Sequence, residues 1–250
     1  MTPALRFVLS LVFLVSCAAA VSAQTRAPEL GHFKCYQVTN PTPLDIVVGT
    51  QDQFDIADKS GFEPTAVRQA WRFCNPVAKL HRRAFYDIPD RSAHLTMYLT
   101  APTDIGVTRR VLIANQFGKQ RLLTFSAPVL ATPTAKNNEG FPEGLDHYKC
   151  YRAYGRPVKA TVSLRDQFHD EPQVRVGYPL LFCNPTRKEH DGVFTGVKNA
   201  QDHLACYQLE PRPFETSVAA IDQFGTAERR VKDANLLCAP TAKLRFERIE

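Results

Sequence analysis

Three short motifs recur four times, in the same order, along this 250-residue chain. The first is His-x-x-Cys-Tyr, the second is Asp-Gln-Phe, and the third is a proline-containing box that ends in lysine. The first motif starts at His32, His94, His147 and His203. The second starts at Asp52, Asn115, Asp166 and Asp222, and the third ends at Lys79, Lys136, Lys188 and Lys243. A repeat of about 55 residues is a supersecondary unit that needs neighbours to bury its apolar face. The chain is therefore predicted to be a tandem-repeat protein.

The cysteines predict the disulfide pairing. The repeats contain six of them, at Cys35, Cys74, Cys150, Cys183, Cys206 and Cys238. The second unit has lost both of its cysteine positions, to Met97 and Ala131, and a joint loss is expected if these two positions are bonded in the other units. We therefore predict one disulfide within each of the other three units. Each would contribute about 3–4 kcal/mol by restricting the unfolded chain, which matters because a unit this small buries little core.

The N-terminus has the pattern of an export signal. Arg6 precedes the apolar run 7–15, and small residues follow as far as Ala23. We favour cleavage after Ala23, which makes residues 1–23 a signal peptide; the alternative is a lipobox whose Cys17 carries lipid. Either route leads to an extracellular, periplasmic or lipid-anchored protein in a compartment where disulfides persist. No transmembrane segment is expected in the mature chain, because no later apolar run approaches the roughly 20 residues required.

Side chains within each motif alternate with the period of a strand. In the first motif, Phe33 and Cys35 share one face, and His32 and Tyr36 share the other. Short alternating runs, separated by turn residues and without a sustained helical period, predict an all-β antiparallel fold.

Units one and three share Cys-Asn-Pro in the third motif, whereas units two and four share Pro-Thr-Ala-Lys. This alternation of two unit types favours two small β-sandwich or barrel-like domains, each made of two disulfide-stapled repeats. The expected domains are residues 32–136, with units 32–79 and 94–136, and residues 147–250, with units 147–188 and 203–243, joined by a linker at 137–146. A single ring of four units is the alternative.

The combination of H-x-x-C-Y, D-Q-F-G and L-C-x-P-x-x-K motifs resembles a family of secreted bacterial tandem-repeat proteins of unknown function. The resemblance covers essentially the whole mature chain, and it implies secretion and a repeat architecture but no activity. The sequence departs from the family pattern at Met97 and Ala131. It also departs at Asp55 and His169, which occupy the position of the motif glycine.

The charge pattern excludes a nucleic-acid partner. The formal net charge is +6, but basic pairs such as Arg82-Arg83 are dispersed among acidic residues and prolines rather than gathered in a stripe. Weak attraction to an acidic glycan or an anionic envelope surface remains compatible with this excess.

The recurring polar side chains are expected to be mainly structural. The second-motif carboxylate becomes Asn115 in one unit, which suits an acceptor for turn N–H groups better than a catalytic acid. The recurring lysines are expected to cover apolar surface with their stems or to pair with acids. The outward-facing residues of the first motif are expected to pack against a second layer, with a repeated ligand-binding face as the alternative. These residues are His32, Tyr36, His94, Tyr98, His147, Tyr151, His203 and Tyr207.

Residues that break the repeat are stronger candidates for function. The third unit alone carries His169-Asp170-Glu171 and Glu189-His190-Asp191. If these two loops met, they would supply enough ligands for a zinc or similar site. No catalytic motif is present, and no cofactor is expected. We therefore predict a non-enzymatic, secreted or surface-tethered β repeat protein that binds an extracellular protein or glycan or serves as an envelope component. A metal-binding or hydrolytic domain that uses the His169 and His190 loops is the alternative.

Overall fold

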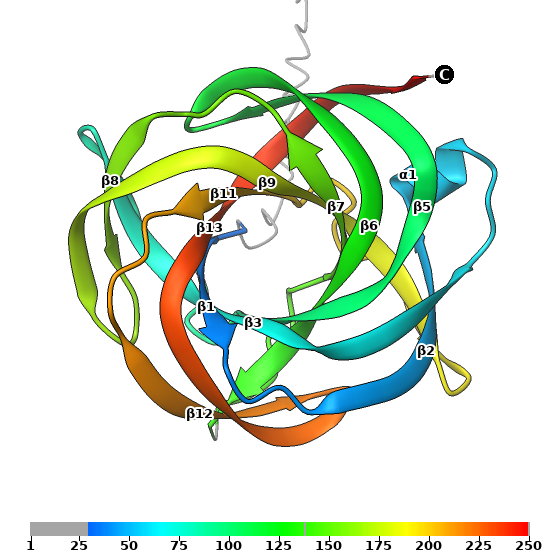
Figure 1. Cartoon of the computed structure of the whole chain (residues 1–250), viewed down its shortest axis with the longest axis horizontal. Helices are drawn as coiled ribbons and strands as arrows, with labels where there is room; N and C mark the ends of the chain where they lie inside the picture. The colour runs from blue at the N-terminus through cyan, green and yellow to red at the C-terminus, as the bar shows by residue number, and fades with distance from the viewer. Residues whose placement is uncertain (1–29, 138, 250) are drawn as a thin grey trace, which may run out of the picture.

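The computed structural model describes residues 30–137 and 139–249, which consist almost entirely of β-strands (Figure 1). Within this part of the chain the single helix is α1, Gln53–Ala57, and no helix is long and apolar enough to cross a membrane. The strand pairs are antiparallel. The predicted all-β antiparallel class is confirmed.

The strands follow the repeat. They are β1 (His32–Val38), β2 (Pro43–Asp52), β3 (Glu63–His81), β4 (Ala84–Tyr86), β5 (His94–Asn115), β6 (Gly118–Lys136), β7 (His147–Tyr154), β8 (Ala160–Arg165), β9 (Asp170–His190), β10 (Val193–Thr195), β11 (His203–Leu209), β12 (Glu215–Asp222) and β13 (Gly225–Ile249). Each unit has a first strand that carries the first motif, a hairpin whose turn carries the second motif, and a long last strand that carries the third. The long last strands are β3, β6, β9 and β13.

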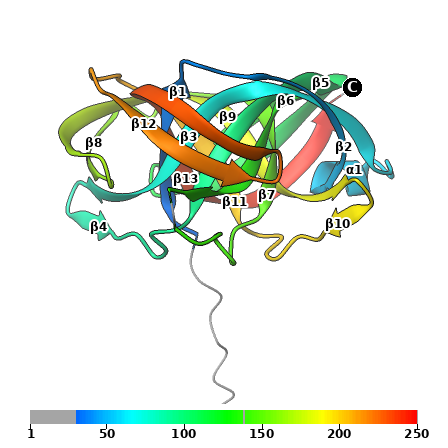
Figure 2. The same cartoon turned by 90° about the horizontal axis from the view of Figure 1, so that it is seen from below.

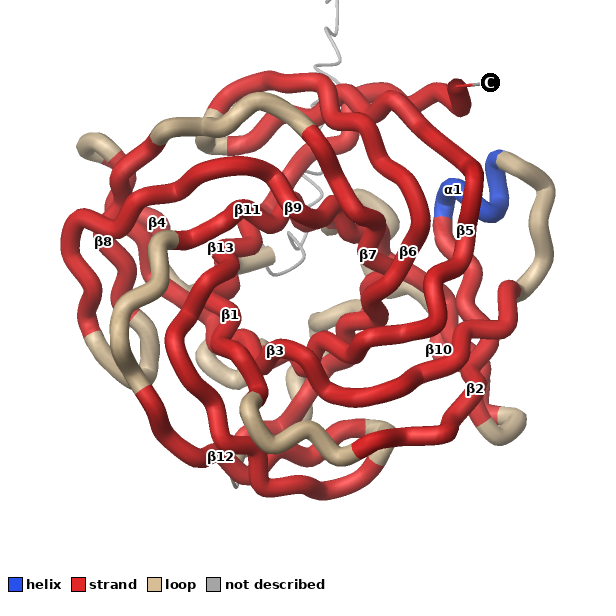
Figure 3. The backbone as a smooth tube through the Cα atoms, in the orientation of Figure 1, coloured by secondary structure: helices blue, strands red, loops and turns tan. Residues whose placement is uncertain are grey.

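First and last strands alternate around a closed inner ring, in the order β1, β3, β5, β6, β7, β9, β11, β13 and back to β1 (Figures 1 and 3). Each first strand bonds the last strand of its own unit on one side and that of the preceding unit on the other. The internal register is the same in all four units, with facing pairs Cys35–Cys74, Met97–Ala131, Cys150–Cys183 and Cys206–Cys238.

This closure corrects the expected division into two domains at 32–136 and 147–250. β6 of the second unit bonds β7 of the third, and β13 of the fourth bonds β1 of the first. The four units thus form one sheet, which is the single-ring alternative, and the predicted linker falls between β6 and β7 of that sheet. Two separate domains would expose the edges of β1, β6, β7 and β13, whereas the ring pairs all of them.

The three predicted disulfides are present, and they lie inside the ring. Cys35–Cys74, Cys150–Cys183 and Cys206–Cys238 are each bonded within one unit. They pack with Met97 and Ala131 in a fully buried apolar cluster. When eight strands close, side chains just fill the interior. Each disulfide therefore cross-links the first and last strands of its own unit, and the sulfur atoms also form part of the core inside the ring.

The hairpins form an outer layer around the ring. The hairpin of each unit bonds the end of the last strand of the unit two places away: β2 with β9, β8 with β3, β12 with β6, and β5 with the end of β13. Units one and three exchange in this way, as do units two and four. Seen edge-on, the ring is flattened, and β4 and β10 project from the face at which β1 begins (Figure 2).

Candidate functional site

The second-motif side chains cap their own turns. Asp52 accepts from the N–H of Phe54 at 2.7 Å, and Asn115 accepts from Phe117 at 2.9 Å. Asp166 and Asp222 make the same contact, at 3.0 and 2.9 Å. The interpretation of these residues as acceptors for turn N–H groups is confirmed.

The second polar atom of each of these side chains reaches the unit two places away. Tyr36 donates to Asp166 at 2.8 Å, and Tyr98 donates to Asp222 at 2.5 Å. Asn115 reverses the direction and donates to the Tyr207 hydroxyl at 2.8 Å. In the first unit, Asp52 accepts from the Asn184 amide at 2.9 Å instead. The second motif therefore joins the hairpins to the ring.

The candidate ligand face of histidines and tyrosines is enclosed between these two layers. The four tyrosines and two of the histidines are at most 1% exposed, His32 is 4% exposed, and His147 is partly buried. Burial and the nearby Lys79 lower the pKa of His32 to about 3. Burial and Lys243 do the same for His203, whose pKa is also about 3. These side chains pack against the outer layer, as expected. The alternative, in which they form an exposed ligand-binding face, is wrong because they are buried or partly buried.

Three of the four third-motif lysines lie over the second-motif phenylalanine of the next unit. Lys79 Nζ is 4.8 Å from the ring centre of Phe117, and Lys136 Nζ is 5.3 Å from that of Phe168. Lys243 closes the cycle at 4.8 Å from Phe54. A cation over an aromatic face is attracted by the ring quadrupole. These contacts give a structural reason for lysine at three of the four positions.

The two candidate metal loops of the third unit do not converge. His169 and Glu171 meet at 2.6 Å, and the His169 ring stacks on Phe214. His190 instead lies against the Phe224 ring and 3.6 Å from Asp191. Glu189 faces Phe194 in the β9–β10 pair, and exposed Asp170 contacts Arg165. Among the described residues, these six side chains form no group of three ligand atoms. The prediction of a metal site at these loops is therefore wrong, because the two loops lie at opposite ends of the long strand β9.

A different acidic group does assemble, around Lys149. Atoms of Asp55, Glu63 and Asp104 lie within 4.8 Å of one another, and the Lys149 ammonium contacts them at 3.0, 2.5 and 2.9 Å. Burial and the neighbouring Asp52 raise the pKa of Asp55 to about 7. The lysine occupies the position that a metal cation would take, so this group is an internal ion network between units one, two and three.

Lys34 of the first unit makes the reciprocal contact. Its ammonium lies 3.1 Å from Glu171 Oε2 and 3.4 Å from His169 Nε2. Lys34 is fully buried and Glu171 is 3% exposed. Here one lysine meets one carboxylate and one imidazole, from two units.

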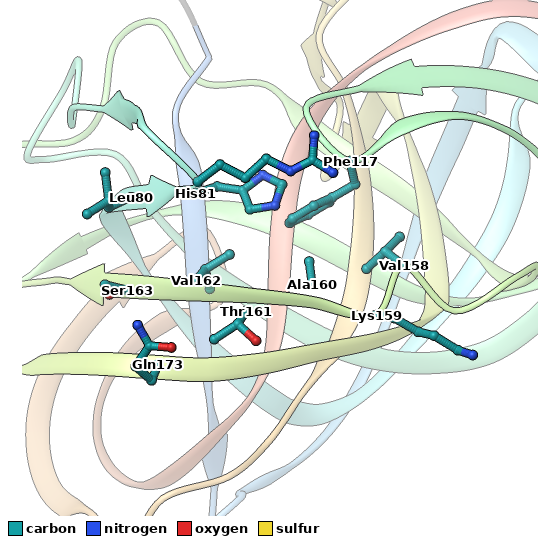
Figure 4. Close-up of a pocket in the computed structure, with 11 residues that line it drawn as sticks. Leu80, His81, Phe117, Val158, Lys159, Ala160, Thr161, Val162, Ser163 and Gln173 are labelled. Atoms are coloured by element: carbon teal, nitrogen blue, oxygen red, sulfur yellow. The ribbon is translucent and has the colours of Figure 1, made fainter.

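An open cavity of about 330 Å³ lies where the end of β3 pairs with β8, and we refer to it as the β8 pocket (Figure 4). Its volume is at the lower end of the range of small-molecule sites. His81 and Phe117 lie on one side of it, across from Ala160, Thr161 and Val162 of β8. Units one, two and three all contribute to its lining.

The β8 pocket is cationic and rich in hydrogen-bonding groups. Arg82 and Lys159 line it together with Thr161, Ser163 and Gln173, and none of its lining residues is a carboxylate. By contrast, Glu247 joins the arginines in the cavity beside β13, and Glu210 joins Lys159 and Arg175 in the one on the other side of β8. The β8 pocket therefore favours an anion.

Sequence patterns did not identify the β8 pocket. In the sequence, Arg82-Arg83 is one of several dispersed basic pairs, and Lys159 belongs to no motif. One signal for the pocket is present in the sequence: the first unit continues beyond its third motif into a basic turn, which lies between β3 and β4 and contains Arg82. The contribution of β8 depends on the exchange between units one and three, which no single unit encodes.

Comparison with known proteins identifies one related family. A family model described as a repeat of unknown function (DUF7450) matches residues 94–240. No curated protein and no solved structure matches the chain.

Proposed function

The chain belongs to the DUF7450 family of repeats of unknown function, and from its geometry we propose an exported, non-enzymatic protein that binds an acidic glycan in the β8 pocket. The observation that carries the proposal is a pocket with two cations, three neutral polar side chains and no carboxylate in its lining.

Each part of the pocket matches a part of an acidic sugar. The guanidinium of Arg82 and the ammonium of Lys159 suit a carboxylate or sulfate. Thr161, Ser163 and Gln173 can exchange hydrogen bonds with the hydroxyl groups of a sugar. The pocket is open to solvent along β8, which accommodates a chain longer than one residue.

The proposal includes export. The three disulfides support an oxidising compartment. The predicted signal, residues 1–23, lies outside the described residues. The intact mass of the native exported protein distinguishes cleavage after Ala23 from lipid attachment at Cys17.

Titration calorimetry of residues 24–250 with a glucuronate-containing tetrasaccharide tests the binding. We expect binding that weakens as salt rises, and no binding of a neutral glucose tetrasaccharide. Arg82→Ala and Lys159→Ala should each weaken it about tenfold or more, because hydrogen bonds to charged groups contribute about 1.5–3 kcal/mol.

The matched control is Arg68→Ala, which removes an exposed arginine from the far end of β3. This variant should bind like the parent protein. Equal loss in all three variants would indicate a general charge effect and contradict the pocket. Absence of binding to the acidic tetrasaccharide would contradict an acidic glycan of this class.

A further inference from the structure

The contact between Lys34, His169 and Glu171 has the composition of a reaction centre. Lys34 Nζ lies 3.1 Å from Glu171 Oε2, and His169 Nε2 lies 2.6 Å from Glu171 Oε1 and 3.4 Å from Lys34 Nζ. An amine, a carboxyl group and a base that can move protons between them therefore touch one another in one place. Reacting groups held at about 3–3.5 Å have the proximity that replaces a bimolecular encounter.

The surroundings exclude water from the two groups that would react. Lys34 is fully buried and Glu171 nearly so. The Lys34 ammonium lies 5.1 Å from the Tyr36 ring centre, and the His169 ring stacks on Phe214 at 4.5 Å. Desolvation of an ion pair costs several kcal/mol per ion. A neutral amide in the same place would remove both charges and release a water molecule to the solvent.

The equivalent positions in the other units lack this combination. The residue aligned with Lys34 is Thr96 in the second unit and Ala205 in the fourth. The third unit has Lys149, but its ammonium is shared among three carboxylates, with no histidine among them. That arrangement holds the proton on the lysine and raises its pKa. The Lys34 centre has a single carboxyl partner and an imidazole acceptor for the proton.

We propose that Lys34 and Glu171 condense to form an isopeptide bond, with His169 as the proton carrier. His169 Nε2 takes a proton from the Lys34 ammonium, and the free Nζ attacks Cδ of Glu171. The Cδ–Oε1 bond breaks, and Oε1 leaves as water with two protons that came from Nζ by way of His169. Oε2 becomes the amide carbonyl oxygen. One N–C bond forms, one C–O bond breaks, and nothing is oxidised or reduced.

The bond would join strands that no disulfide connects. The three disulfides each close a loop within one unit, whereas this amide would tie β1 of the first unit to β9 of the third. It would persist under reducing conditions, in which the disulfides open.

The intact mass of residues 24–250, reduced and denatured, provides the first test. We expect it to be lower than the sequence mass by one water molecule. Trypsin should fail to cut after Lys34, and the peptide that contains Lys34 should be found attached to residues 166–175. If the mass equals the full sequence mass and trypsin cuts normally after Lys34, the proposal is overturned.

Three variants assign the reaction to these residues. Lys34→Met should restore the full sequence mass. Glu171→Gln should lose ammonia instead of water and give the same cross-linked product as the parent chain. His169→Gln should leave a larger fraction of the freshly expressed protein at the full sequence mass. The control is Lys149→Met, which should still lose one water, because its lysine belongs to the other ion network. Loss of water in Lys34→Met would place the reaction elsewhere and contradict the assignment.

Discussion

Tyr98 of the second unit donates its hydroxyl to Asp222 of the fourth at 2.5 Å, across the boundary between the ring and the outer layer. Arg229 donates to the same hydroxyl at 2.7 Å. With the contact from Tyr36 to Asp166 between units one and three, this pair shows how the outer layer is held. Each hairpin is attached through a buried or partly buried hydrogen bond to a unit that is not its neighbour in sequence.

Removing the hydroxyl at this boundary should destabilise the whole ring. The Tyr98 hydroxyl bonds both Arg229 and Asp222. Tyr98→Phe therefore removes one hydrogen-bond partner from each of them. An unsatisfied buried polar group costs about 1–3 kcal/mol. We therefore expect the free energy of unfolding, measured with urea, to fall by that amount. Tyr154→Phe, on a tyrosine that is 67% exposed, should change stability little. An equal effect of the two substitutions would contradict the role of the contact.

A fourth disulfide should form where the second unit lacks one. Met97 and Ala131 face each other in the register that the cysteines occupy in the other three units. We expect the double variant Met97→Cys, Ala131→Cys to form a disulfide and to contain no free thiol. This disulfide should stabilise the oxidised protein by about 3–4 kcal/mol. Thiol titration and unfolding with and without reductant check this. Two free thiols in the folded variant would contradict the shared register.

Lys79 should make stability depend on pH. It is fully buried, and its Nζ has no hydrogen-bond partner among the described residues. Burial lowers its pKa to about 7, below the unfolded value near 10.4. The unfolded chain therefore binds more protons between about pH 7 and pH 10.4, and stability contributed by this group rises across that window and is lowest below it.

Replacing this lysine should reverse the effect. We expect Lys79→Met to stabilise the protein by about 1–3 kcal/mol near neutral pH, with the gain shrinking as pH approaches the unfolded pKa. Urea unfolding at several pH values measures this. Lys119→Met, on an exposed lysine, is the control and should follow the parent curve. A constant gain at all pH values would show that packing rather than ionisation is responsible.

Lys149→Met should convert an internal ion network into a cation site. Without the ammonium, Asp55, Glu63 and Asp104 retain oxygens within 4.8 Å of one another but lose their shared counter-charge. Breaking a buried pair costs about 3–5 kcal/mol. Hard divalent cations prefer such oxygen ligands, so we expect calcium to restore stability in this variant and to leave the parent protein unchanged. A thermal-shift titration decides this, and equal shifts in both proteins would contradict it.

The sequence by itself determined the local structure. Period-two alternation placed Phe33 and Cys35 inside the ring and His32 and Tyr36 outside it, because alternation depends only on the strand geometry of each unit. The joint loss at Met97 and Ala131 identified the disulfide partners, because both positions lie in the same unit. Substitution of Asn115 for aspartate indicated a capping role, since a cap needs an acceptor oxygen rather than a charge.

Only the tertiary structure decided which units are partners. Four copies of the same motifs can pair in several ways, because their similar side chains give each alternative similar local interactions. The alternation of unit types suggested neighbouring pairs, whereas it is the like units that exchange hairpins: Asn75 of the first unit contacts Asp166 of the third, and Asn184 of the third contacts Asp52 of the first. That exchange buried the histidine and tyrosine face and brought β8 to the end of β3, where the pocket lies. The choice depends on contacts between residues more than 80 positions apart, and on closure that leaves no inner strand edge unpaired.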